Sequence, residues 1–155
     1  MSLKRSQIRM TTEEREAFLD QSRTLYLASH GADGFPHLVA MWFVREGVRI
    51  LMTTYRKSPK VANLRADARS AILFEDGTAY NTLRGVFLRG RCTVIDHEET
   101  TLRTLEGIRR RSEGGGLAAP DVLAAMRAQA RKRVVLSFEA EKTGSWDHAK
   151  LGGVY

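Results

Sequence analysis

The chain has 155 residues, of which 43% are hydrophobic and 28% are charged, and its formal net charge is +7. Such a length and composition are typical of one compact globular domain, so we expect a single domain over residues 1–155. No apolar run approaches the roughly 20 residues of a membrane span. The amino terminus lacks the apolar segment of a secretory signal, and one cysteine cannot form an internal disulfide. We therefore expect a cytoplasmic protein that does not enter the membrane.

The positive charge suggests nucleic-acid binding, because Lys and Arg side chains neutralise phosphates. Much of the excess, however, lies in two predicted helical segments around Arg109–Arg111 and Arg127–Arg133. No nucleic-acid motif accompanies these segments. Solvated helix faces explain these residues best, the rim of an anionic ligand is the second interpretation, and we expect no nucleic-acid partner.

The first predicted element is a helix that begins after Thr11, because Thr11 and Glu14 have the spacing of a capping box. Phe18 and Leu19 on this helix are expected to pack on the core. The hydrophobic period then changes to that of strands. Short apolar runs bounded by turn residues predict strands over 25–29, 38–44, 48–54, 70–74, 86–95 and 133–140.

Capping residues and prolines predict three further helix starts, at Ser58–Pro59, at Asp96 with Glu99, and at Pro120. The helix after Asp96 is predicted to end near Arg111. The Gly114–Gly116 run lacks the flanking strand of a phosphate-binding loop, so we interpret it as a linker. Residues 142–155 are predicted to form a polar tail after the last strand.

Six hairpin-rich strands with inserted helices favour a mainly β fold of the α+β class, an antiparallel barrel rather than a Rossmann fold. The G-x-G-x-x-G and Walker motifs of nucleotide-binding folds are missing from the sequence. In the fifth predicted strand Cys92 shares a face with Val86 and Leu88, which indicates a buried structural thiol rather than a nucleophile.

The basic loop between the third strand and the following helix is the strongest candidate site. Arg56, Lys57, Ser58 and Lys60 lie where a strand delivers the chain to a helix N-terminus. Free backbone N–H groups, the helix dipole and these cations favour one bound anion over a solvated loop. Thr53 and Thr54 can offer hydroxyl groups beside it, although β-branched residues are also expected in strands for packing.

Other candidate residues are weaker. The four histidines have no metal-ligand spacing, so we expect no metal and assign them surface or hydrogen-bonding roles. Trp42 fits a core position slightly better than a ligand wall. Trp146 lies in the predicted polar tail, where an exposed indole needs a partner subunit or a ligand to cover it.

Five segments together resemble the pyridoxamine 5'-phosphate oxidase-like split β-barrels, which bind FMN or the deazaflavin F420. They are PHLVAMWF (36–43), the Thr53–Thr54 pair with SPK (58–60) and Asn63–Leu64, DAR (67–69), RGVFLRG (84–90) and the closing SWDHAKLGGVY (145–155). The last segment resembles the tail of actinobacterial F420-type members in particular. The resemblance implies a six-stranded antiparallel split barrel, FMN-binding-like, that forms a homodimer.

The resemblance also implies a cofactor site at the dimer interface. The ring would lie along Val39, Ala40, Met41 and Trp42, and the ribityl chain and phosphate would be held by Thr53, Thr54, Arg56, Lys57, Ser58 and Lys60. Trp146, His148 and Lys150 would approach from the partner subunit. Tyr80 and His148 are weak candidates for a proton donor.

The function that this resemblance favours is an F420-dependent oxidoreductase, which transfers a hydride between the deazaflavin and a small organic acceptor. The acidic tail of F420 suits a protein with a charge of +7. Two alternatives stay open: an FMN-dependent oxidoreductase of the same family, and a split barrel that binds flavin or haem without turnover. The residues that bind the substrate phosphate in true pyridoxamine-phosphate oxidases find no match in this sequence.

Overall fold

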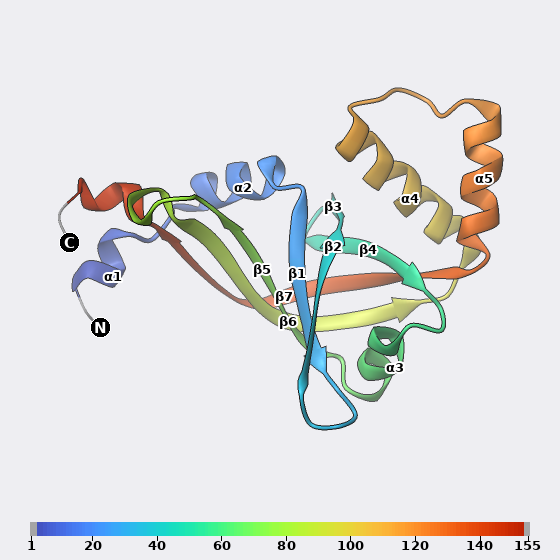
Figure 1. The fold of residues 1–155 in the computed structure, drawn as a ribbon, viewed down its shortest axis with the longest axis horizontal. Helices are drawn as coiled ribbons and strands as arrows, with labels where there is room; N and C mark the ends of the chain where they lie inside the picture. The colour runs from blue at the N-terminus through green and yellow to red at the C-terminus, as the bar shows by residue number, and fades with distance from the viewer. Residues whose placement is uncertain (1–2, 154–155) are drawn as a thin grey trace.

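The protein forms a single curled antiparallel sheet with helices inserted between its strands (Figure 1). The computed structural model describes residues 3–153. The seven strands are arranged in the order β2-β1-β5-β6-β7-β4-β3. They are β1 (Thr24–His30), β2 (Pro36–Trp42), β3 (Val44–Glu46), β4 (Arg49–Tyr55), β5 (Arg69–Asp76), β6 (Arg84–Ile95) and β7 (Arg133–Asp147).

The α-helices are α1 (Leu3–Gln7), α2 (Thr12–Gln21), α3 (Pro59–Ala66), α4 (Glu98–Glu113) and α5 (Pro120–Ala130). Two short 3-10 helices, η1 (Tyr80–Thr82) and η2 (His148–Leu151), follow β5 and β7. The predicted capping box of α2 is confirmed, since Thr11 and Glu14 exchange hydrogen bonds. Helix α4 begins one residue later than predicted. Its N-cap residue is His97 rather than Asp96, and the His97 side chain accepts a hydrogen bond from the Thr100 backbone N–H.

The predicted fold class is confirmed, with one short strand more than expected. The run 38–44 was predicted as one strand, but β2 ends at Trp42 and Val44 begins β3. β2 and β3 are the two edges of the sheet, so the chain crosses from one edge to the other at Phe43. Phe43 is 1% exposed and its ring packs edge-on against Phe74. This buried residue therefore draws the two edges together and nearly closes the barrel.

The longest ladder joins β6 and β7 and bends at Gly90. The register shifts between Arg89 and Gly90, and a Cβ at position 90 would overlap the carbonyl of Glu139. Only glycine permits this close approach of two backbones. The bend lets one pair of strands run from α5 to the opposite end of the molecule (Figure 1).

The predicted tail is wrong in its first part, because β7 continues from Ala140 to Asp147 as a partner of β6. This part of the strand has a polar sequence because its side chains, from Glu139 to Asp147, are exposed or half-buried, and a polar sequence does not predict a strand. Val154 and Tyr155, the last residues of that predicted tail, lie outside the described residues.

The core lies on the inner face of the sheet, which we define as the face that carries the side chains of Leu25, Leu27, Met52 and Ile72. Phe18 and Leu19 pack against it from α2, as predicted, and Leu64 packs against it from α3. Cys92 is fully buried there, and burial raises the pKa of its thiol to about 12. The predicted structural role of this cysteine is therefore supported, because a thiol at neutral pH is a poor nucleophile.

Helices α4 and α5 pack on each other and on β4 and β7 through a second small core of Leu102, Met126 and Ala130. Several of their arginines are neutralised locally: Arg109 pairs with Glu113, Arg127 with Glu99, and Arg131 with Glu98. These pairs explain much of the basic character of the two helices without a ligand. No helix within residues 3–153 is long and apolar enough to cross a lipid bilayer.

Candidate functional site

A cluster of hydroxyl and ammonium groups lies at the end of β4, where the chain enters α3. Lys60 Nζ donates to Thr54 Oγ1 at 3.0 Å, and Thr54 Oγ1 lies 3.2 Å from Ser58 Oγ. Ser58 is the N-cap residue, but its side chain makes no capping hydrogen bond. Its hydroxyl is directed to Thr54 instead, so the cap predicted for this helix is wrong in its chemistry and right in its position.

This cluster carries positive charge that no acidic group neutralises. Among residues 3–153 neither Lys57 nor Lys60 has an ion-pair partner. Burial, and then the nearby charge of Arg133, lowers the pKa of Lys60. Both effects disfavour the charged form of Lys60 in the absence of a negative partner. A bound anion would stabilise the charged form and raise this pKa again.

Arg56, the first basic residue of the predicted site, has contacts within the chain that the sequence did not predict. Its guanidinium makes two hydrogen bonds of 2.8 Å to the carboxylate of Asp96, and Nη1 donates to the carbonyl of Arg131. Asp96 and the carbonyl of Arg131, the residue after α5, hold Arg56 in place. This arginine is therefore engaged before any ligand binds. An arginine already neutralised in this way adds little to an anion site.

A cavity of about 520 Å³ lies on the outer face of the sheet, the face opposite the core, and the only residue of β4 that lines it is Thr53, next to Thr54 of the cluster. Ala40, Met41 and Trp42 of β2 line it together with Thr53 of β4. Helices α4 and α5 supply the other wall through Leu105, Ile108, Arg109, Ser112, Glu113, Met126 and Gln129. The mixture of apolar walls and a few polar groups is typical of a small-molecule site.

The side chains predicted to hold a ring divide between the two faces of β2. Trp42 is 61% exposed, so the expectation that it belongs to the core is wrong. Strand alternation sends Val39 and Met41 inward, where both pack on the core, and Val39 does not line the cavity. Thr53 and Thr54 likewise point to opposite faces, Thr53 to the cavity and Thr54 to Lys60.

Arg133, the first residue of β7, also lines this cavity, and sequence reasoning missed it. It pairs with Tyr55 across the β4–β7 ladder, and its guanidinium lies over the Tyr55 ring at 4.2 Å. In the sequence Arg133 is one of several basic residues after α5. Only the strand register distinguishes it from them, and that register cannot be read from local spacing.

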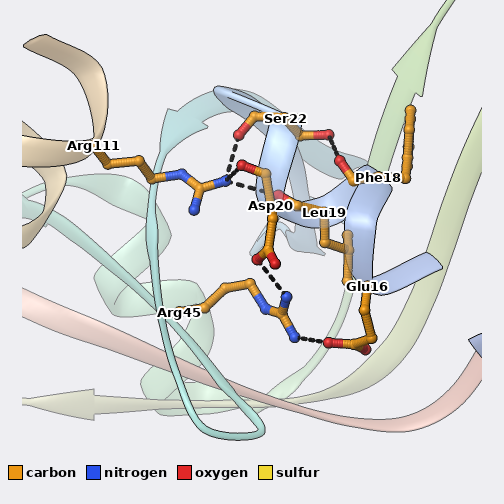
Figure 2. Close-up of polar contacts among 7 residues, drawn as sticks. All are labelled: Glu16, Phe18, Leu19, Asp20, Ser22, Arg45 and Arg111. Carbon is orange, nitrogen blue, oxygen red and sulfur yellow. Dashed lines mark hydrogen bonds and ion pairs between the residues drawn. The ribbon is translucent and has the colours of Figure 1, made fainter. Parts of the chain in front are cut away.

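Helix α4 is tied to the barrel by Arg111 (Figure 2). Arg111 Nη2 lies 2.7, 3.0 and 2.6 Å from the carbonyls of Leu19, Asp20 and Ser22, at the C-terminus of α2. The same guanidinium stacks on Phe43 at 4.3 Å. Arg45 pairs with Glu16 and Asp20 on the same helix. This network fixes the end of α4 that contributes Ser112 and Glu113 to the cavity.

The tail residues predicted to touch the cofactor lie elsewhere in the same chain. The Trp146 indole packs on Gly85, Lys150 bonds the carbonyl of Arg9 and the carboxylate of Glu14, and His148 Nδ1 lies 3.0 Å from the carbonyl of Tyr80. Trp146 and His148 line a second, larger concavity of about 970 Å³ on the outer face. The structure therefore does not bring these residues to Lys60 within one chain.

The two weak candidates for a proton donor are brought together. The rings of Tyr80 and His148 lie 4.6 Å apart between centroids, with a tilt of 53°. Tyr80 is 57% exposed. The pair thus combines an exposed Tyr80 with a half-buried His148, which lines the larger concavity together with Trp146.

The curled antiparallel sheet, the inserted helices and the cavity at the β2 edge define a split barrel of the FMN-binding-like class. The sequence model of the family described as pyridoxamine 5'-phosphate oxidase matches residues 11–147. The chain therefore belongs to the pyridoxamine 5'-phosphate oxidase-like family, as the sequence resemblance predicted. Members of this family bind FMN or F420.

Solved structures support the same assignment. The conserved hypothetical protein Rv2991 from Mycobacterium tuberculosis is 37% identical, with a TM-score of 0.88 over 97% of this chain and 93% of that one. An F420 reductase is 24% identical, with a TM-score of 0.65 over 83% and 94%. The heme storage protein HutZ from Vibrio cholerae is 12% identical, with a TM-score of 0.67 over 89% and 97%. The last two show the fold alone. No curated protein matches the sequence.

Proposed function

We propose that this protein is an F420-dependent oxidoreductase that acts on a small organic acceptor. The observation that carries the proposal is the Lys60–Thr54–Ser58 cluster at the end of β4, the strand whose Thr53 lines the 520 Å³ cavity. An ammonium group with a lowered pKa and two hydroxyl groups fit a phosphate, and the adjoining apolar wall fits a flat ring. The bound cofactor would supply hydride chemistry that no side chain can perform.

The chain's own residues would bind and orient. Lys60 would donate to the phosphate while Thr54 and Ser58 add neutral donors. Ala40 and Met41 would present a flat strand edge to the ring, and the small Ala40 side chain leaves room for it. Leu105, Ile108 and Met126 would exclude water from the opposite side. Such positioning is the protein's contribution to a reaction between two bound molecules.

F420 is preferred over FMN on the basis of charge and of the tail segment 145–155. Three cations near the cavity, Lys57, Lys60 and Arg133, have no acidic partner among residues 3–153, which suits a ligand with several negative charges. The similar fold of an F420 reductase is consistent with this choice. The second candidate is a split barrel that binds its ligand without turnover, and HutZ, described as a heme storage protein, has the same fold.

We also propose a homodimer whose sites are completed by the partner's Trp146, His148 and Lys150. Two observations support it. The outer face is apolar and concave, with Leu38 66% exposed and Tyr26, Leu73 and Phe87 lining the larger concavity. Exposed apolar surfaces of this kind are typical of protein interfaces. The end of β7 and the helix α3, which carries Lys60, also lie at opposite sides of the molecule (Figure 1).

The decisive experiment is a titration of the purified protein with F420 and with FMN side by side, followed by stopped-flow mixing of the reduced complex with candidate acceptors. We expect tighter binding of F420 and reoxidation that depends on an acceptor. Stoichiometric yellow FMN in the purified protein, with no response to F420, would make FMN the working cofactor. Tight binding without any reoxidation across quinones, nitro compounds and enones would favour the carrier function.

A further inference from the structure

Arg133 differs from the other half-buried arginines with a buried Nε in having nothing to which it donates. Its Nε is buried and has no hydrogen-bond partner. Arg109 and Arg111 also have a buried, unpaired Nε, but their terminal nitrogens donate to Glu113 and Gly116 and to the carbonyls at the end of α2. No side-chain hydrogen bond or ion pair of Arg133 exists within residues 3–153.

A purely structural explanation is that Arg133 only stacks on Tyr55. A cation–π contact of this kind stabilises by about 0.5–1 kcal/mol at an exposed site. Stacking uses the flat face of the guanidinium and leaves its N–H edge without an acceptor. A buried donor left unpaired costs roughly 1–3 kcal/mol, so the stack alone does not account for the arrangement.

The surroundings of Arg133 point to an anion. Arg133 lies close enough to Lys60 to lower the pKa of that amine, and both residues lack an acidic partner among the described residues. Two like charges held together in a partly buried position are unfavourable unless a negative group lies between them. Arg133 also lines the cavity with Trp42 and Thr53, whereas Lys60 bonds Thr54, the residue of β4 that follows Thr53.

We propose that Arg133 is a second cationic ligand for the cofactor's phosphate group, opposite Lys60, and that it distinguishes phosphorylated from unphosphorylated ring compounds. The inference rests on the proposed function and adds to it a residue from a strand far along the chain. Its planar fork donates two parallel hydrogen bonds to phosphate oxygens, which the single ammonium of Lys60 cannot do. Tyr55 holds the fork in place, so little conformational freedom is lost on binding.

Matched ligand pairs test the proposal. FMN and riboflavin differ only in the phosphate, so they are the matched pair. The ribityl deazaflavin chromophore of F420 lacks both the phosphate and the acidic tail, so the F420 pair supplements that comparison. Arg133→Gln should weaken binding of FMN and F420 by roughly 10- to 150-fold, as expected for a lost charge-assisted hydrogen bond. Binding of riboflavin and of the chromophore should not change. Arg133→Lys should recover part of the loss.

The control variant is Arg131→Gln, two residues earlier, whose side chain pairs with Glu98 at the surface. It should bind all four ligands like the native protein. An equal loss for phosphorylated and unphosphorylated ligands in Arg133→Gln would mean that Arg133 shapes the ring site, and the inference would fail. Unchanged FMN affinity would also overturn it.

A cofactor-independent measurement separates this inference from the proposed function. Inorganic phosphate at tens of millimolar, compared with chloride at equal ionic strength, should raise the thermal midpoint of the native protein. Both Arg133→Gln and Lys60→Met should lose that increase, whereas Arg131→Gln keeps it. If neither FMN nor F420 binds the native protein, the proposed function fails, and this phosphate response alone decides the role of Arg133. A response that persists in Arg133→Gln refutes the inference.

Discussion

Gly85 and Trp146 face each other across the β6–β7 ladder, and the indole ring of Trp146 occupies the space that a Cβ at position 85 would need. A side chain at position 85 would also approach the carbonyl of Phe74 at 2.8 Å. The indole therefore has cover within its own chain, contrary to the expectation from its polar sequence context. Glycine at position 85 sets where the ring lies on the sheet.

We predict that Gly85→Ala displaces Trp146 and destabilises the protein by about 1–3 kcal/mol, as overpacking does. Urea unfolding and the emission of Trp146 in a Trp42→Phe background would measure both effects. Gly144→Ala is the matched control, because its Cβ would lie 3.7 Å from the nearest atom, on Phe87. That variant should be as stable as the native protein. Equal urea midpoints and emission for both variants would contradict the prediction.

Lys60 and Lys57 provide a second matched pair. Lys60 bonds Thr54 and is half-buried, whereas the Lys57 side chain is exposed. Lys60→Met should weaken cofactor binding by roughly 10- to 150-fold at low salt, since a charge-assisted hydrogen bond to phosphate is lost. Lys57→Met should weaken it less and mainly through a salt-dependent field. An unchanged dissociation constant for Lys60→Met would place the phosphate elsewhere.

Mixed dimers test whether a site is shared between subunits. A Trp146→Ala chain and a Lys60→Met chain each form two defective sites when alone. In the mixed dimer one site combines a native Lys60 with the native Trp146 of the other chain, so one tight site should return per dimer. Titration after subunit exchange, with exchange verified by mass spectrometry, measures it. No recovery of tight binding, or a monomeric protein, would exclude the shared site.

The sequence predicted the parts of this molecule that local chemistry determines. The Thr11 capping box, the buried face of β6 with Cys92 and the position of α3 all follow from neighbouring residues, and the family resemblance supplied the barrel. The features that the sequence did not predict depend on contacts between residues far apart in the chain. Arg56 is engaged by Asp96, 40 residues away, and β7 continues to Asp147 only because β6 is there to pair with it.

The anchoring of α4 leads to a stability prediction. Arg111→Met removes a charged donor that serves three carbonyls at the end of α2 and the stack on Phe43. We expect a loss of about 2–4 kcal/mol, because hydrogen bonds to charged groups contribute about 1.5–3 kcal/mol and the carbonyls remain partly buried. Urea midpoints would measure it. Arg110→Met, on the exposed side of the same helix, should change the midpoint little. Similar losses in both would show that the anchor does not matter.

Cys92 predicts a pH dependence. Burial raises the pKa of its thiol to about 12 in the folded protein, above the value of an exposed thiol. The folded state therefore binds more protons, and this contribution to stability is complete below the exposed pKa of about 8.5 and is lost as pH rises toward the folded pKa. The free energy of unfolding should fall by up to about 1.4 kcal/mol per pH unit in that window relative to Cys92→Ala. Parallel pH profiles would contradict this, as would reaction of the native thiol with a disulfide reagent at neutral pH.

Strand β7 is long enough to connect the two concavities of the outer face. It begins at Arg133, beside Lys60, and ends at Trp146 and Asp147 against η2, so one extended segment of 15 residues reaches both halves of the outer face. In a dimer with shared sites, each copy of this strand would belong to both cofactors at once. Occupancy of one site would then affect the other through the β7 backbone, which pairs with β6 over most of its length and with β4 over residues 133–139. Titration of such a dimer should then follow two coupled binding steps rather than two independent ones. The bend of the β6–β7 ladder at Gly90 would either transmit this coupling or weaken it.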